Sequence, residues 1–345
     1  PDWSSEVIFE GACPPCTPDC ESTGTIEPEA SEESSEGLVP NTDGPGVIIG
    51  SESTDVGFAW IANSEENWPI GTGSGTVSKL DLETGEEVGR YLVGLAGQDN
   101  SPSRTAVDGN GDAYVACRAF AEQGTVVKIA AAPEDCIDRN GNGTIQTSTG
   151  SIPLALGTDE CVLWTANVGV RGDTPRALVV DLGGLDSSAG LPWVGLHDAN
   201  RMLQLDPDNG SVLADIPIGV SPYGAAIDSR GNIWISGFFS GQIVRLDSMA
   251  RTVDPPIGVG GCMGPYGIAT DNRDRVWMGT FSNSACRYDP ADGSIFQVSL
   301  PTSDVSSRGV AVDGFDMVWV AAHSMDAGYF FGFHADDGLG MVSVS

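Results

Sequence analysis

A repeat of about 42 residues is the feature that most constrains how this chain can fold. Tryptophans mark the repeat at intervals of 41, 43 and 42 residues, at Trp193, Trp234, Trp277 and Trp319. In the last three copies an aspartate precedes the tryptophan by six residues. A regular repeat of this length indicates one supersecondary unit that is stacked several times.

Each copy consists of short apolar runs separated by turn residues. The copy around Trp234 reads Gly-Ala-Ala-Ile-Asp at 224–228, Asn-Ile-Trp-Ile-Ser at 232–236 and Gln-Ile-Val-Arg-Leu-Asp at 242–247. Alternating runs rich in β-branched and aromatic residues predict strands, and pairs such as Arg230-Gly231 predict tight turns. The chain contains 46 Gly and 21 Pro, as expected for many short elements. No segment has a helical apolar stripe.

These units predict an all-β propeller, with blades of four antiparallel strands that pack face to face around an axis. Two degenerate copies, at Trp60 and Tyr114, bring the count to six. The step from Tyr114 to Trp193 is 79 residues, so either one blade is expanded or a seventh lies around residues 161–164. Residues 176–181 resemble the first strand of the next copy, which favours six blades and an insertion around 130–175. We expect the six aromatic rings to be buried between blades.

Aspartates close the predicted first strands. In the turns that follow, we expect these side chains to accept backbone N–H bonds. They are Asp108, Asp181, Asp228, Asp271 and Asp313.

The first 46 residues have a different composition from the rest of the chain. They carry eleven acidic residues and no Lys or Arg, which predicts a tail or linker over 1–46 and the propeller over 47–345. Residues 7–9, Val-Ile-Phe, are a candidate short strand. The start at Pro1, without Met or a basic segment, is typical of a processed N-terminus.

Eight cysteines, an even number, predict disulfides and therefore a secreted, periplasmic or cell-surface protein. We expect Cys136 to pair with Cys161 across the insertion and Cys262 to pair with Cys286 within one repeat. The other four are expected to be partly paired, with Cys117 as a candidate partner for the N-terminal group. That group is Cys13, Cys16 and Cys20, for which a redox or metal role is the alternative reading.

The charge balance excludes some classes of partner. Against 48 Asp and Glu there are 16 Lys and Arg, a formal net charge of −32, which disfavours nucleic acid and anionic membranes. No apolar run approaches 18 residues, so no membrane span is predicted. The remaining partners are a protein, a glycan or a small molecule.

One loop has the spacing of a calcium site. Residues 138–145 read Asp-Arg-Asn-Gly-Asn-Gly-Thr-Ile, which matches the first half of an EF-hand loop. The expected ligands are the side chains of Asp138, Asn140 and Asn142 and the carbonyl of Thr144, with a plain turn as the alternative. The similar run 108–112 falls where every blade turns and is read as a turn.

Three histidines occur, His197, His323 and His334. His197 and His323 both follow a predicted second strand, so they are the candidate catalytic residues, and exposed loop histidines are the alternative. Ser324 and Asp326 lie beside His323, but adjacency in sequence does not establish the geometry of a triad.

The runs at 222–234 and 265–271 resemble the repeats of virginiamycin B lyase-like propellers and of the NHL and gluconolactonase-like groups. The resemblance covers residues 47–345. It implies a Mg²⁺-assisted ring-opening elimination that uses His and Glu at the central face. The corresponding stretches here, 234–237, 277–280 and 319–323, contain no Glu and only His323. We therefore expect a non-catalytic binding module, with a metal-assisted lyase or hydrolase at the central face as the alternative.

Overall fold

The computed structural model describes residues 38–40, 47–49, 57–64, 75–183, 189–262 and 264–344. The chain divides into two compact units, Pro1–Asp55 and Val56–Ser345. In the first unit the described residues form an antiparallel hairpin of β1 (Leu38–Pro40) and β2 (Val47–Ile49).

Some sequence-based expectations fall outside the described residues. They concern the candidate strand at 7–9 and the cysteines Cys13, Cys16 and Cys20.

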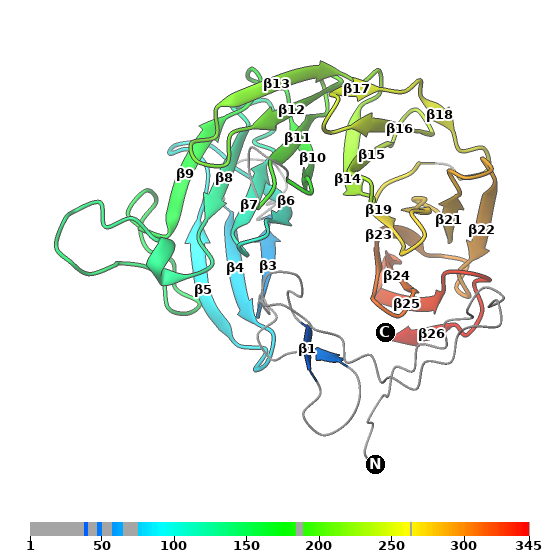
Figure 1. The fold of residues 1–345 in the computed structure, drawn as a ribbon, viewed down its shortest axis with the longest axis horizontal. Helices are drawn as coiled ribbons and strands as arrows, with labels where there is room; N and C mark the ends of the chain where they lie inside the picture. The colour runs from blue at the N-terminus through cyan, green and yellow to red at the C-terminus, as the bar shows by residue number, and fades with distance from the viewer. Residues whose placement is uncertain are drawn as a thin grey trace, which may run out of the picture. The chain divides into compact units, whose positions relative to one another are not determined.

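The second unit is a β-propeller of six antiparallel sheets that follow one another around a ring (Figure 1). We number the sheets as blades 1 to 6 in chain order. The innermost strands of blades 2 to 6 are β6 (Pro102–Val107), β10 (Pro175–Val180), β14 (Pro222–Ile227), β19 (Ile268–Thr270) and β23 (Ser306–Val312). The second strands of blades 1 to 6 are β3 (Phe58–Asn63), β7 (Ala113–Cys117), β11 (Pro192–Leu196), β15 (Asn232–Gly237), β20 (Val276–Gly279) and β24 (Met317–His323).

The outer half of each blade completes the sheet. The third strands are β4 (Thr76–Asp81), β8 (Thr125–Ile129), β12 (Arg201–Leu205), β16 (Gln242–Asp247), β21 (Ser284–Tyr288) and β25 (Gly328–His334). The outermost strands are β5 (Glu87–Leu92), β9 (Val162–Asn167), β13 (Val212–Pro217), β17 (Thr252–Val253) with β18 (Ile257–Gly258), β22 (Ile295–Ser299) and β26 (Val342–Val344).

The six-blade prediction is confirmed, and the seven-blade alternative is wrong. Trp164 lies on β9, the outermost strand of blade 2, and β10 is the innermost strand of blade 3. The expansion is the long connection between β8 and β9. It contains η1 (Pro133–Asp135), the only helix in the described part of the chain.

Each repeated aromatic residue lies on the second strand of its blade. Five of the rings are buried, and each belongs to a different apolar core shared with the next blade; these five are Trp60, Tyr114, Trp193, Trp234 and Trp277. Trp319, in blade 6, is partly buried. A single blade cannot cover both of its faces, so these rings fill the space between neighbours, as the repeat predicted.

The aspartates at the ends of the innermost strands hold both the turn and the aromatic ring. Oδ1 of Asp228 accepts the backbone N–H groups of Arg230 and Asn232, at 3.0 and 2.9 Å, as expected for the turn. Its Oδ2 accepts the indole N–H of Trp234 at 2.9 Å. The same aspartate-to-indole bond recurs in blades 3, 5 and 6.

Glycines let neighbouring blades approach closely near the axis. A Cβ at Gly267 would lie 2.5 Å from the carbonyl oxygen of Arg308, and the Gly267 N–H donates to that same oxygen at 2.9 Å. A Cβ at Gly224 would lie 2.8 Å from the carbonyl oxygen of Tyr266. Any larger residue at either position would push adjacent blades apart.

The described residues contain two disulfides, Cys136–Cys161 and Cys262–Cys286, so both predicted pairs are confirmed. Cys262–Cys286 lies in the core between blades 4 and 5. Cys117 is buried on β7 as a free thiol, and the N-terminal cysteines for which it was a candidate partner lie outside the described residues. Burial among apolar groups raises the pKa of the Cys117 thiol to about 12.

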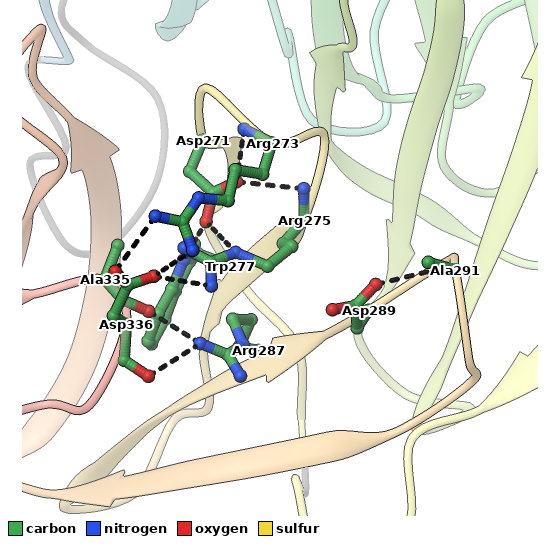
Figure 2. A network of polar contacts seen from close by, with 9 residues as sticks. All are labelled: Asp271, Arg273, Arg275, Trp277, Arg287, Asp289, Ala291, Ala335 and Asp336. Atoms are coloured by element: carbon green, nitrogen blue, oxygen red, sulfur yellow. Dashed lines mark hydrogen bonds and ion pairs between the residues drawn. The ribbon is translucent and has the colours of Figure 1, made fainter. Parts of the chain in front are cut away.

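An arginine and aspartate network joins blades 5 and 6 (Figure 2). Asp336, in the turn between β25 and β26, accepts hydrogen bonds from Arg273 and Arg275, at 2.7 and 2.9 Å for the closest pairs. Arg287 donates to the carbonyl oxygens of Ala335 and Asp336. In this network every arginine faces an acidic or carbonyl oxygen, and two of the three pair with a carboxylate.

Candidate functional site

β-Bulges at the start of the innermost strands redirect side chains near the axis. In β14 the register shifts between Pro222 and Gly224, so Tyr223 is an extra residue in the pairing with β15. In β23 the register shifts between Ser307 and Val310, which likewise places Arg308 in a bulge. An extra residue breaks the alternation of the strand and turns its side chain to a new direction.

The other blades place side chains at the corresponding positions. Arg176 lies in the bulge of β10, and Arg104 follows the bulge of β6. Tyr266 precedes β19, where Gly279 pairs with both Tyr266 and Gly267. Five blades therefore each place one large side chain on the same face of the propeller.

The second strands end at the same face of the propeller, and the residues that follow them add aromatic rings and one more arginine. Phe238 follows β15, Phe281 follows β20 and Arg118 follows β7. The centroid of the Tyr223 ring lies 4.3 Å from that of Tyr266, and the centroid of Phe238 lies 4.9 Å from that of Phe281. We call the whole group the arginine–aromatic cluster: Arg104, Arg118, Arg176, Arg308, Tyr223, Tyr266, Phe238 and Phe281.

The arginines lie over the aromatic rings. Cζ of Arg176 is 4.0 Å from the centre of the Tyr223 ring, and Cζ of Arg308 is 3.6 Å from the centre of the Phe281 ring. Arg104 lies 5.7 Å from the centre of the Tyr266 ring. These distances are in the range of cation–π attraction, which fixes the guanidinium planes without neutralising their charge.

The cluster concentrates positive charge in a strongly acidic protein. Burial, together with the nearby charges of Arg104 and Arg118, lowers the pKa of Arg176 to about 10. Burial also lowers the pKa of Arg104. Within the described ranges, no ion pair involves Arg104, Arg176 or Arg308. The cluster therefore gathers guanidinium groups at one place, where they attract anions.

The contrast with the Asp336 network shows that Arg176 has no carboxylate partner among the described residues. Arg273 and Arg275 bond to the carboxylate of Asp336 (Figure 2). The guanidinium of Arg176 faces the ring of Tyr223, hydrogen-bonds to the side chain of Tyr266 and lies near the charges of other arginines. Buried charges normally have partners, so an arrangement of this kind is typical of a site that receives a ligand.

His197 lies at the edge of the cluster. Its ring packs edge-on against Tyr223 and Phe239, with centroids 5.9 and 5.6 Å apart, and its Nδ1 lies 3.1 Å from Asp198. Its Nε2 is buried without a hydrogen-bond partner among the described residues. The second-strand position therefore brings His197 beside the arginines.

His323 has a different setting at the end of β24. Its side chain is exposed and its Nδ1 lies 3.1 Å from the carbonyl oxygen of Ser324. The Ser324 hydroxyl bonds to the backbone of the same turn, at Asp326 and Ala327. These contacts are those of a turn and include no serine-to-histidine hydrogen bond. His334 ends β25 and is also exposed.

The loop at 138–149 gathers the predicted metal ligands on one turn. The carboxylate of Asp138 accepts the backbone N–H groups of Gly141 and Gly143, at 2.7 and 2.8 Å. Asn140 and Asn142 both bond to Gln146, and Gln146 also bonds to the Thr144 carbonyl. In the described residues no group of three or more His, Cys, Asp or Glu side chains has the arrangement of a metal site. Calcium binding at this loop stays a prediction.

Sequence reasoning missed the four arginines. One signal was available when the repeats are aligned on their aspartates. Arg176 and Arg308 fall in the column that holds Tyr223 and Tyr266 in other blades, and Arg104 falls one position after it. The chain has only 16 Lys and Arg, so the recurrence of arginine at or beside one repeat position was informative.

No family model matches the chain, and no curated protein matches its sequence. Among solved structures, virginiamycin B lyase from Staphylococcus aureus is similar, with a TM-score of 0.56 and 14% identity over 83% of this chain and 88% of that one. A catalytically inactive variant of that lyase, solved with quinupristin, has a TM-score of 0.55, also at 14% identity over 83% and 88% of the two chains.

The extracellular domain of a putative one-component system from B. thetaiotaomicron has a TM-score of 0.51 at 11% identity. That match covers 90% of this chain and 36% of the other. No helix in the described residues is long and apolar enough to cross a membrane.

At identities of 11% to 14%, the likeness to these solved structures concerns the fold. The chain therefore has the six-bladed β-propeller fold of virginiamycin B lyase and related propellers, as its repeats indicated.

Proposed function

We propose that this chain is a non-catalytic binding propeller that takes an organic anion at the arginine–aromatic cluster. The observation that carries the proposal is the guanidinium group of Arg176. It is buried, it lies 4.0 Å from the centre of the Tyr223 ring, and no carboxylate in the described part of the chain pairs with it. A bound anion would supply the missing charge and form strong charge-assisted hydrogen bonds.

The aromatic residues indicate that the anion has an apolar body. Phe281 and Phe239 are 40% and 75% exposed, and they lie beside the half-buried rings of Phe238 and His197. Exposed aromatic rings next to fixed polar groups are typical of small-molecule sites, in which the rings contact the ligand and the polar groups orient it.

The alternative, a metal-assisted lyase or hydrolase at this face, requires groups that hold a cation and move a proton. The cluster is cationic, and its members in the described residues include no carboxylate. A divalent cation would be repelled there. His197 is the one residue beside the cluster suited to proton transfer, which favours binding over catalysis.

The proposal includes an extracytoplasmic location and calcium at the 138–149 loop. Two disulfides support the location, since such bonds persist in oxidising compartments and are rare in the cytosol. The spacing of Asp138, Asn140 and Asn142 supports the calcium.

Thermal melts test anion binding. Benzoate in millimolar excess is expected to raise the melting temperature by a few degrees, because it binds the folded state, whereas neutral benzyl alcohol leaves it unchanged. The shift should disappear in Arg176→Gln. Arg230→Gln is the matched control, because Arg230 is exposed and lies beside Asp274 in a turn on the opposite face of the propeller. An equal shift in Arg176→Gln, or no shift with any organic anion, would contradict the proposal.

A further inference from the structure

The number of uncompensated charges in the cluster bears on the charge of its ligand. Arg104 and Arg176 are neighbours, because their Cζ atoms lie 5.6 and 4.0 Å from the centre of the same Tyr223 ring. Neither forms an ion pair within the described ranges. Arg118, the third guanidinium nearby, also donates from Nη2 to the Ser64 hydroxyl at 3.0 Å. Two adjacent positive charges, of which Arg176 is buried and Arg104 is half-buried, are thus left for the ligand to balance.

We infer that the head group of the ligand is a dianion of the phosphate monoester class, bound by Arg104 and Arg176, with its apolar body toward Phe238 and Phe281. The inference rests on the anion-binding function proposed above. A carboxylate or sulfate ester carries one charge and would leave one guanidinium unbalanced in a buried setting. A phosphate monoester carries nearly two charges above its second pKa of about 6 and presents three acceptor oxygens to the guanidinium donors.

The side chains around the two arginines support this assignment. Cζ of Arg104 lies 5.6 and 5.7 Å from the ring centres of Tyr223 and Tyr266, and Arg176 lies against Tyr223. Both guanidinium groups are therefore held in place before a ligand arrives. Rigid donors lose little entropy when they bind, and a planar guanidinium matches the oxygens of a phosphate.

The titration of the ligand gives a test that separates a dianion from a monoanion. Phenyl phosphate changes from dianion to monoanion between pH 8 and pH 5, whereas phenyl sulfate keeps one charge throughout. The titratable groups that face the cluster are Arg118, Arg308, Tyr223, Tyr266 and His197. A change in the charge of any of them acts on both ligands, so the ratio of the two affinities isolates the head group.

The experiment is isothermal titration of the full chain with phenyl phosphate, phenyl sulfate and inorganic phosphate at pH 8 and pH 5. We expect phenyl phosphate to bind at least tenfold more tightly than phenyl sulfate at pH 8. The ratio should fall about tenfold at pH 5, where about a tenth of the phosphate is dianionic. Inorganic phosphate should bind more weakly than phenyl phosphate, because it lacks the apolar body.

Variants locate the effect. Arg104→Gln and Arg176→Gln should each remove the preference for phenyl phosphate, whereas Arg104→Lys and Arg176→Lys should keep part of it. Arg230→Gln should keep all of it. Equal and pH-independent affinities for the two phenyl esters would overturn the dianion inference and leave anion binding intact. Failure of every anion to bind would overturn both.

Discussion

The indole Nε1 of Trp277 donates a hydrogen bond to Oδ2 of Asp271, which lies six residues earlier in the chain and 3.0 Å away. Oδ1 of the same carboxylate accepts the backbone N–H groups of Arg273 and Arg275 in the turn between them. One aspartate therefore fixes the turn of blade 5 and the orientation of the ring that packs against blade 6. This double role explains why the aspartate and the tryptophan are six residues apart in the repeat.

Replacing Trp277 by alanine should destabilise the protein by about 3–5 kcal/mol, as large core truncations do. Trp277→Phe should cost less, because it keeps most of the apolar burial and removes only the hydrogen bond to Asp271. Urea denaturation measures both changes. Phe315→Ala is the control, since Phe315 is 89% exposed, and it should have almost no effect. A cost below about 1 kcal/mol for Trp277→Ala would mean that this ring does not hold the two blades together.

Asp336→Asn should weaken the junction of blades 5 and 6 in a pH-dependent way. The hydrogen bond from Arg275 and the charges of Arg273 and Arg275 hold the pKa of Asp336 below its ordinary value. A carboxyl with a lowered folded-state pKa stabilises the fold above its unfolded pKa of about 3.9, and that stabilisation is lost as the pH falls through the folded pKa. The variant should therefore melt earlier than the parent at pH 7 and at the same temperature near pH 2.

The neighbouring substitution Asp337→Asn is the control, because Asp337 accepts only the Leu339 N–H in its own turn. Its melting curves should follow those of the parent from pH 7 to pH 2. A difference between Asp336→Asn and the parent that stays constant over the whole range would show that the charge of Asp336 is not what joins the blades.

Removing the disulfide of blade 5 should cost about 3 kcal/mol, because the bond closes a loop of 24 residues in the unfolded chain. The double variant Cys262→Ala/Cys286→Ala should show this loss in urea denaturation without reductant. The free thiol of Cys117 should react with thiol reagents only after denaturation, because it is buried and its pKa is raised. Reaction of Cys117 at the rate of an exposed thiol in the native protein would contradict its placement in the core.

Calcium should raise the melting temperature through the loop at 138–149. Asp138 is the one carboxylate among the predicted ligands, so affinity should be weak, with a Kd of about 10⁻⁴–10⁻³ M. Millimolar Ca²⁺ should stabilise the parent relative to EDTA, and Asp138→Ala should lose that shift. Asp198→Ala, at an exposed position outside the loop, should keep it. A full shift in Asp138→Ala would show that the loop is only a turn.

The repeat was enough to predict the fold, but it could not predict the arginine–aromatic cluster, and the reason is physical. Alternation and spacing locate strands, so Trp234 and its equivalents could be placed on second strands between blades. Alternation cannot locate a bulge, where one extra residue reverses the side on which Arg176 or Tyr223 emerges. Arg104 and Arg176 are also 72 residues apart and belong to different blades, so only the ring brings them together.

The bulges separate what holds the propeller together from what it recognises. Trp234 and Asp228 act between and within blades, whereas Tyr223, Arg176 and Arg308 lie in bulges, outside the regular pairing. Blades 3, 4 and 6 thus each offer one position that can be exchanged without altering a strand pair. Because these positions lie around one axis, a substitution at any of them can change what the propeller binds while the strands that support it stay the same.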